Sequence, residues 1–372
     1  MKITEVKPFV VDHWVYIKIV TDEGIYGIGE ASLGSREMAV VEAIRHVTPL
    51  LVGEDPGRIE FIWQDIFRTR QGGPVLQAVL SGIDLALWDI QGKALGVPVY
   101  RLLGGPTRDK VLFYRHTGGR TPEQAAENAQ RLVEEEGCKV IRISPVSGTR
   151  NILEPGPAVR KSVRHFRAIR DAVGEEMEII FEVHTRLDPP RAIELCNAIS
   201  EFRPFFVEDP IRSENPASFA LLRQHIHVPI GTGEKFNSKW QFRELIEGDL
   251  IDYLRIDLCR VGGITEGKKV AAMGETHYQD LALHHTISSV NTIANIHLNA
   301  GVPNCAVQEY GAPPAWMADL FKHLPVAEDG YLLLPDRPGL GLEFDEEVAA
   351  AHPYRPSERT RLRRLDGSVQ NW

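Results

Sequence analysis

Short apolar runs alternate with amphipathic stretches over most of the chain, and this alternation predicts its secondary structure. After residue 110, eight strand-like runs are separated by helical patterns, seven of which are clear. The first of these helices has a typical start, with Thr121 as the cap, Pro122 in the first turn and Gln124 three residues after the cap. Eight strands that alternate with helices predict an α/β fold, a (β/α)8-type barrel of the modified TIM kind. The predicted strands span residues 111–116, 138–144, 177–184, 204–209, 228–234, 251–257, 280–285 and 305–310.

The chain before the barrel follows a different pattern. Residues 15–31 alternate apolar and polar positions around an Asp-Glu-Gly turn, which is typical of a β-hairpin. Strands followed by helices predict an α+β unit, and the helical patterns here cover 36–52, 56–67 and 74–95. After about Tyr331 the sequence is rich in Pro and Gly. We therefore expect three regions, namely an N-terminal α+β domain, a barrel domain and a C-terminal segment that packs back on the first domain, over 1–110, 111–330 and 331–372.

Three glutamates end three successive apolar runs. Glu182, Glu208 and Glu234 are spaced 26 residues apart, which is about the length of one strand, one helix and two short loops. They should therefore lie at the carboxyl ends of neighbouring strands, on one rim of the barrel. Carboxylates that converge in this way repel one another unless a cation lies between them. Oxygen ligands suit a hard divalent ion, so we expect all three to bind Mg²⁺.

A similar spacing, with gaps of 23, 27 and 25 residues, continues through the next three strands, which end at Asp257, His284 and Glu309. His284 can act as a general base, with Asp257 orienting its second ring nitrogen and stabilising the imidazolium. His285 is the adjacent alternative, but side chains alternate along a strand, so it should point away from the rim. Single Asp and Glu residues often only begin loops or cap helices, whereas six polar strand ends in phase favour an active site.

Composition narrows the classes of partner. The formal net charge of −9 argues against nucleic acid and against anionic membrane surfaces. The four cysteines are far apart and form no zinc or disulfide pattern, so reduced thiols in the cytoplasm fit best. The first residues have no apolar signal core, and no stretch approaches the roughly 20 apolar residues of a membrane helix.

Several motifs together resemble the enolase superfamily in its mandelate racemase-like branch, over nearly the whole chain. They are the helix Ala78–Lys93 with its continuation to Gly105, the Val-Glu-Asp-Pro of 207–210, Glu234, and the stretch from Asp257 to Gly263. The resemblance implies that the N-terminal domain caps the barrel mouth. It also implies one essential Mg²⁺, abstraction of a proton next to a carboxylate, and a symmetric homo-oligomer.

Within that branch the sequence resembles acid-sugar dehydratases of the mannonate and galactonate dehydratase type. Glu182-Val183-His184 and Arg142 match the mannonate group, as do Arg70–Val75 and Gln308–Tyr310. The first metal ligand is Glu182 where most relatives have Asp. Neither the common second-strand lysines nor the tyrosine that follows the arginine in the mannonate group is present. The Asp257–His284 pair instead resembles racemases and galactonate dehydratases.

The resemblance implies a Mg²⁺-dependent dehydratase of an aldonate or aldarate that yields a 2-keto-3-deoxy acid through a metal-stabilised enediolate. We expect His284 to take the proton alpha to the carboxylate. His184 lies two residues past Glu182 and should therefore face the same side of the strand, so we assign it the protonation of the departing β-hydroxyl. Alternatively, His284 performs both proton transfers. Arg142 would clamp the carboxylate or a hydroxyl, and Glu309 would bind the carboxylate if it is itself protonated.

Substrate specificity is expected from loops of the N-terminal domain and from residues that line the polyol chain. The candidates are Ser32, Arg68, Arg70 and Gln71 for the loops, and His116, Tyr310 and Trp316 for the lining. Two other functions stay open at this point. One is a racemase or epimerase of a hydroxy acid, although Ser144 stands where a second base would be needed. The other is a catalytically silent member that binds acids or serves as a regulator.

Overall fold

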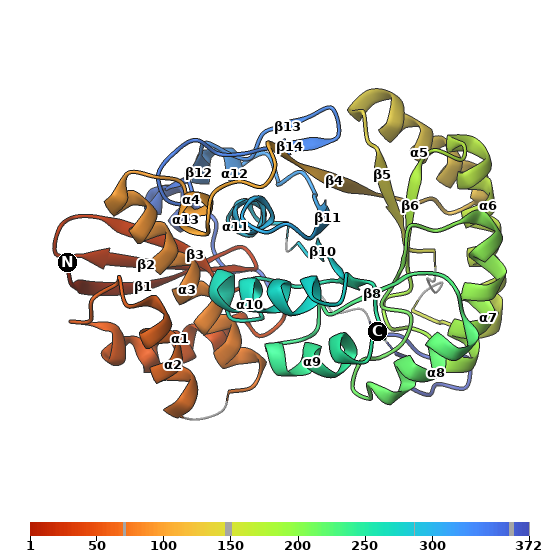
Figure 1. Ribbon diagram of the computed structural model, residues 1–372, viewed down its shortest axis with the longest axis horizontal. Helices are drawn as coiled ribbons and strands as arrows, with labels where there is room; N and C mark the ends of the chain where they lie inside the picture. The colour runs from red at the N-terminus through yellow and green to blue at the C-terminus, as the bar shows by residue number, and fades with distance from the viewer. Residues whose placement is uncertain (70–71, 146–150, 286, 357–360, 372) are drawn as a thin grey trace.

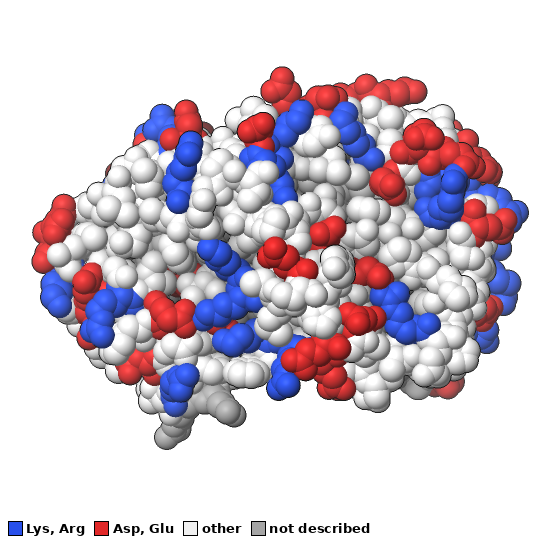
Figure 2. Space-filling view, in the orientation of Figure 1, with Lys and Arg blue, Asp and Glu red and all other residues white. Residues whose placement is uncertain are grey.

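The computed structural model describes residues 1–69, 72–145, 151–285, 287–356 and 361–371 (Figure 1). The N-terminal unit contains a three-stranded sheet. Figure 1 shows this unit with its helices on one side and a larger barrel unit on the other. Acidic and basic side chains are interspersed over the face drawn in Figure 2. No helix in the described part of the chain combines the length and apolar character needed to cross a bilayer. All four cysteines are free thiols.

The N-terminal unit is an antiparallel sheet covered by helices. The predicted hairpin is confirmed as β2 (Trp14–Thr21) and β3 (Tyr26–Glu30), and β1 (Ile3–Val11) pairs with the other side of β2. Strand β1 was not predicted, because Pro8 and the charged Glu5 and Lys7 obscure its alternation; an edge strand tolerates this proline. The three predicted helices are confirmed as α1 (Glu37–Leu51), α2 (Ile59–Thr69) and α3 (Pro74–Leu95). A short fourth helix, α4 (Val99–Leu102), follows them.

The eight predicted barrel strands all form, and the sheet closes because the last strand pairs in parallel with the first. They are β4 (Lys110–Thr117), β5 (Val140–Ile143), β6 (Glu178–Glu182), β7 (Val207–Glu208), β8 (Ile230–Thr232), β9 (Tyr253–Leu254), β10 (Asp280–Leu283) and β11 (Cys305–Glu309). The intervening helices are α5 (Pro122–Glu136), α6 (Pro155–Val173), α7 (Pro189–Ile199), α8 (Ala217–His225), α9 (Lys239–Glu247), α10 (Gly263–Glu275) and α11 (Ser289–Ala300), with a 3-10 turn, η1, at Ser200–Phe202. The Thr121 hydroxyl caps α5 as predicted, accepting the Gln124 N–H.

Alternate residues of each strand face either the barrel interior or the surrounding helices. A small apolar layer fills the interior and is separate from the large core between strands and helices. Its buried members are Tyr114, Val140, Ile180, Phe206, Ala282 and Val307. The polar residues that end the strands lie beyond this layer, so the apolar layer forms the bottom of the site that holds their charged groups.

Helix α3 joins the two units. On one side it packs closely on β3, where a Cβ atom on Gly29 would lie 1.9 Å from the Gly82 carbonyl oxygen. On the other side it lies against α10. The indole nitrogen of Trp88 donates to Thr265 Oγ1 at 2.9 Å, and the Thr265 amide donates to Asp84 Oδ2 at 3.1 Å. These contacts fix the N-terminal unit against the barrel at the end where β9 leads into α10.

The chain after β11 contacts both units. Its elements are α12 (Met317–Leu320), β12 (Phe321–Lys322), β13 (Ala327–Glu328), β14 (Tyr331–Leu333), β15 (Glu343–Phe344) and α13 (Glu346–Ala351). Strand β14 pairs with β4 of the barrel, while Glu346 forms an ion pair with Lys18 of the first sheet. Farther on, Gln370 donates from its amide nitrogen to the Arg186 carbonyl. The expected boundaries at residues 110 and 330 stay a prediction.

The Asp84 carboxyl at the junction of α3 and α10 should make stability depend on pH. Burial raises its pKa from 3.8 to about 7, so ionising it in the folded protein costs about 4 kcal/mol at most. The folded state therefore binds this proton more tightly than the unfolded state. Relative to Asp84→Asn, the wild-type free energy of unfolding should fall as pH rises from about 4 to about 7, and then level off. Urea titrations of both proteins across this range measure the difference, and a difference independent of pH would contradict the assignment.

Candidate active site

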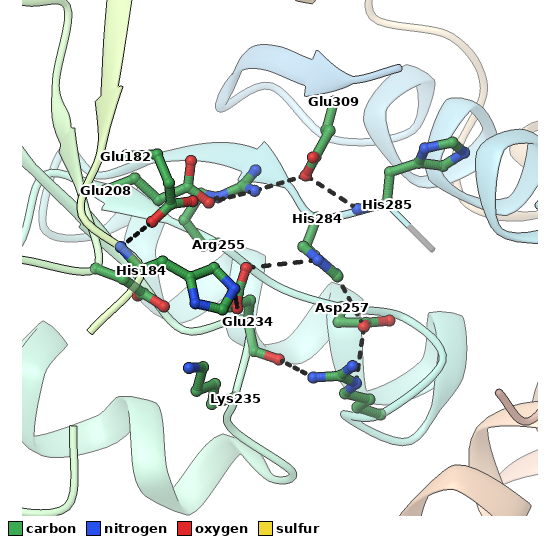
Figure 3. Close-up of polar contacts among 12 residues, drawn as sticks. Glu182, His184, Glu208, Glu234, Lys235, Arg255, Asp257, His284, His285 and Glu309 are labelled. Carbon is green, nitrogen blue, oxygen red and sulfur yellow. Dashed lines mark hydrogen bonds and ion pairs between the residues drawn. The ribbon is translucent and has the colours of Figure 1, made fainter. Parts of the chain in front are cut away.

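Three glutamates meet at the carboxyl ends of adjacent strands, as the spacing predicted. Glu182 and Glu208 are the last residues of β6 and β7, and Glu234 follows β8 by two residues. One carboxylate oxygen from each lies within 4.8 Å of the others, and all three side chains are buried. Figure 3 shows them converging from neighbouring strands. Three anionic oxygen donors at this separation fit a hard divalent cation such as Mg²⁺.

The cluster is electrostatically costly on its own. Burial raises the pKa of Glu182 well above its usual value, and the neighbouring Glu208 carboxylate raises it further. Burial also acts to raise the pKa of Glu234, but His284 and His184 outweigh it and bring that pKa to about 2. The site thus depends on positive charge supplied by its neighbours.

Arg142, at the end of β5, provides part of that charge. Its Nη1 atom lies 2.8 Å from Glu182 Oε2, 3.2 Å from Glu208 Oε2 and 3.6 Å from Glu309 Oε1. Its Nε atom is buried and has no hydrogen-bond partner in the described part of the chain. The guanidinium therefore lies directly against two of the expected metal ligands.

Arg255 is a second cation, which sequence reasoning missed. It is fully buried in the barrel, where Nε donates to Glu208 Oε1 at 2.7 Å and Nη2 donates to Glu309 Oε2 at 2.7 Å. It therefore ties β7 to β11 across the interior (Figure 3). A signal was available, because Arg255 precedes Asp257 by two residues, and side chains two apart in a strand share a face.

His284 and Asp257 form the expected pair. His284 Nδ1 lies 2.9 Å from Asp257 Oδ2, and its Nε2 lies 3.4 Å from Glu234 Oε2. Burial lowers the pKa of His284, but the two carboxylates raise it by more, so that it ends above its ordinary value. Asp257 is held in place in turn, because the Cys259 amide donates to its Oδ1 at 2.8 Å and Arg260 forms an ion pair with its Oδ2.

His184 lies beside the cluster, but not for the reason the sequence suggested. Strand β6 ends at Glu182, and His184 has a left-handed backbone with φ of 57°, so strand alternation does not orient it. Its amide donates to Glu182 Oε1, and its Nε2 lies 3.9 Å from Glu234 Oε1. Burial lowers the His184 pKa to about 4, so its ring is neutral near pH 7.

The surroundings of Glu309 keep its side chain ionised, whereas the role expected for it, binding the substrate carboxylate, required a protonated side chain. Burial acts to raise its pKa, but Arg142, Arg255 and His116 outweigh this and bring it well below the usual range. His116 Nε2 lies 2.5 Å from Glu309 Oε1, which brings His116 to the edge of the same group. A protonated Glu309 that donates to a substrate carboxylate is therefore not supported, and the cations around Glu309 are better placed to bind that carboxylate.

Two other candidates make their ring contacts outside the carboxylate cluster. Tyr310 follows the inward-facing Glu309, so strand alternation turns it outward, where its ring packs on Phe113 at 5.1 Å; the expectation that it lines the site was wrong. Trp316 stacks on His352 at 4.1 Å and contacts Trp14, and its expected place along the polyol chain stays a prediction.

His285 points away from the cluster as predicted, with its Nε2 bonded to Thr292 Oγ1 (Figure 3). Ser32 accepts a hydrogen bond from the Val15 amide within the N-terminal unit. Arg68 lines a different cavity, described below. The candidates Arg70 and Gln71 fall outside the described residues.

Comparison with known proteins places the chain in a family. Residues 5–104 match the mandelate racemase and muconate lactonizing enzyme N-terminal domain, and residues 124–348 match the enolase C-terminal domain-like model. A D-galactonate dehydratase family member of Halomonas elongata is 37% identical, with 97% of this chain and 96% of the relative covered. A D-mannonate dehydratase of a Caulobacter species is 36% identical, with the same coverage.

Solved structures agree with these matches. An enolase of Pantoea ananatis, solved with bound D-gluconate and Mg, is 34% identical with a TM-score of 0.95, and 99% of each chain is covered. A putative galactarate dehydratase of Agrobacterium radiobacter is 28% identical with a TM-score of 0.93 and full coverage of both chains. The barrel, the domain packed on it and the family matches lead to one conclusion. The chain belongs to the mandelate racemase and muconate lactonizing enzyme family of the enolase superfamily.

Proposed function

We propose that the protein is a Mg²⁺-dependent dehydratase of a sugar acid, an aldonate or aldarate, and that it produces a 2-keto-3-deoxy acid. The observation that carries the proposal is the juxtaposition of three buried carboxylates with a histidine–aspartate pair. His284 Nε2 lies 3.4 Å from Glu234 Oε2, so the base borders the group that would hold the cation. The relatives named as galactonate and mannonate dehydratases, and the bound D-gluconate of the Pantoea enzyme, support the same class of substrate.

The cation site would be formed by Glu182, Glu208 and Glu234, and Mg²⁺ is the ion that their oxygen donors fit best. The chemistry that a divalent cation supplies at such a site is electrostatic, because it polarises a bound carboxylate and lowers the cost of negative charge on it. Arg142 adds a permanent positive charge beside the same carboxylates. Its buried Nε can donate to a substrate oxygen.

We assign the removal of the proton at C2 to His284. Its raised pKa means that the ring holds a proton firmly once it has taken one, and Asp257 at 2.9 Å stabilises the imidazolium and fixes the tautomer. The electron pair left at C2 then expels the hydroxyl at C3 as water, and the enol rearranges to the 2-keto acid. The hydroxyl needs a proton as it leaves.

His284 is also the better candidate for this second proton transfer. The low pKa of His184, about 4, makes a protonated ring scarce near pH 7, whereas His284 has just gained a proton. Removal of the proton and delivery to the leaving group from one side gives a syn elimination. His184, 3.9 Å from Glu234, is then a group that orients the substrate or a cation ligand. The expected homo-oligomer stays a prediction.

The reaction is tested by a screen of aldonic and aldaric acids for 2-keto acid product, with wild type and His284→Asn, both loaded with Mg²⁺. General-base catalysis contributes about 10²–10⁴-fold, so kcat/KM of the variant on the productive acid should fall by at least about a hundredfold. Its affinity for Mg²⁺ should change far less than its activity, because the three carboxylates that would hold the ion are left in place.

The matched control is His285→Asn, which alters the neighbouring histidine on the outer side of the strand. It should keep most of the activity if its melting temperature is maintained. Equal loss of activity in both variants would point to a structural effect and would remove His284 from the mechanism. A substrate found with full activity in His284→Asn would do the same.

The metal site is tested by replacing each carboxylate with its amide, as Glu182→Gln, Glu208→Gln and Glu234→Gln. Loss of an outer-shell partner alone costs about 10–100-fold in metal affinity, so each variant should bind Mg²⁺ at least about a hundredfold more weakly. Titration calorimetry measures this affinity. Glu194→Gln on the surface of α7, whose side chain is 42% exposed, is the control and should bind as wild type does. Unchanged Mg²⁺ affinity in all three variants would rule out this ion site.

A further inference from the structure

A second cavity lies between the N-terminal unit and the barrel, and none of the residues assigned above to catalysis or metal binding lines it. It has a volume of about 950 Å³ and is bordered by the end of α2, the start of α3 and the start of α9. Figure 1 shows α9 beside this part of the N-terminal unit. The chain segments that form it are distant in sequence, because lining residues of 64–68 and 72–77 come together with residues 237–241.

Two helices start at this cavity, and neither has an acidic residue in its first turn to offset the partial positive charge of its N-terminus. Gly73 is the N-cap of α3 and Ser238 is the N-cap of α9, and both line the cavity. Neither cap makes a side-chain hydrogen bond to its helix. Each start therefore retains the partial positive charge of a helix N-terminus, with backbone N–H groups that can donate to an anion.

The charged side chains of the lining have the same sign. Arg68 and Lys239 line the cavity, and the described lining residues include no carboxylate. Lys239 is paired with Glu266 at 2.7 Å, so its charge is largely compensated. The Nε atom of Arg68 donates to the side-chain amide of Gln64. This amide is neutral, so the contact does not offset the positive charge of Arg68. Both the helix starts and Arg68 thus favour one bound anion.

A buried glutamine indicates that the ligand also carries hydroxyl groups. Gln77 lines the cavity, is only 1% exposed, and its Oε1 atom has no hydrogen-bond partner in the described part of the chain. A buried polar atom without a partner costs about 1–3 kcal/mol, so a donor from a bound molecule would be stabilising here. The amides of Gln64, Asn237 and Gln241 lie in the same lining and extend this polar surface.

The remaining feature is an aromatic edge. Trp240 lines the cavity with a side chain that is 61% exposed, and Phe67 lies in the same lining. An exposed indole offers a flat apolar face together with one N–H donor, which suits the C–H face of a polyhydroxy chain. The lining thus combines a cation, two helix N-termini, several amides and an aromatic face, and this combination suits one class of ligand.

We propose that this cavity is a second binding site for a polyhydroxy carboxylate, separate from the catalytic carboxylates. The carboxylate of the ligand faces Arg68 and the two helix starts, its hydroxyl groups donate to Gln77 and exchange hydrogen bonds with the neighbouring amides, and its carbon chain lies on Trp240. The lining alone suggests the ligand class, so the site stands whether or not the protein is a dehydratase.

The test counts binding sites on the full-length Mg²⁺-loaded His284→Asn variant, in which the probe is not consumed. The probe is radiolabelled D-gluconate in equilibrium dialysis. Two molecules should bind per chain. Adding Arg68→Ala removes a charge-assisted contact and should weaken one of the two sites by about tenfold or more, and Trp240→Ala should weaken the same site. Arg45→Ala on the surface of α1 is the matched control and should leave both sites intact.

The ligand class is tested in the same experiment by competition. Sorbitol, which has the hydroxyl groups without the carboxylate, and acetate, which has the carboxylate alone, should each compete far more weakly than unlabelled gluconate at the Arg68-dependent site. One site per chain that is unaffected by Arg68→Ala and Trp240→Ala would overturn the proposal, and so would acetate or phosphate competing as well as gluconate. One site per chain that is lost in both variants would support this cavity and would instead count against the proposed catalytic site.

Discussion

The rest of the site depends on one constraint. Three ionisable carboxylates are buried together above the apolar layer at the end of a closed barrel. Burial and mutual repulsion raise the pKa of Glu182, and an unbalanced cluster of this kind would favour protonation over metal binding. The protein counters this with two arginines that lie against the acids. Arg142 contacts Glu182 and Glu208, and Arg255 holds Glu208 and Glu309 from within the barrel.

The same arrangement places the proposed base. Glu234 is shared, because its carboxylate belongs to the cluster and also lies 3.4 Å from His284 Nε2. Asp257 takes the other ring nitrogen and is itself held by the Cys259 amide and by Arg260. The base therefore cannot turn away from the cluster without breaking its own hydrogen bond to Asp257. A proton removed at this point is taken close to where a bound cation would polarise the substrate, as the proposed elimination requires.

Much of this could be predicted from the sequence, because a strand and helix repeat brings residues of one phase to one rim. That logic located Glu182, Glu208, Glu234, Asp257 and His284 correctly at the strand ends. It failed where the local backbone departs from a regular strand, and where the alternation of side chains along a strand was not taken into account. His184 lies beyond the end of β6 with a left-handed backbone, and Tyr310 is turned outward by the alternation that turns Glu309 inward.

Other features could not be read from the chain because they depend on tertiary contacts. The role of Arg255 requires that β7, β9 and β11 surround one interior. The second cavity requires that the starts of α3 and α9, which are distant in sequence, meet across the junction of the two units. The position of Trp316 depends on the return of the C-terminal segment to the first sheet, which places His352 against its ring.

The most direct test of the account is the fate of hydrogen at C2 and C3 of the substrate in heavy water, followed by proton NMR. Wild-type protein with Mg²⁺ should remove the C2 proton signal of the productive sugar acid and yield a 2-keto-3-deoxy acid that carries solvent deuterium at C3. His284→Asn with Mg²⁺ and wild type without divalent ions should show neither change. Elimination or exchange that proceeds equally well in His284→Asn, or without a divalent ion, would contradict the central claim that the carboxylate cluster and His284 act together on the proton next to the carboxylate.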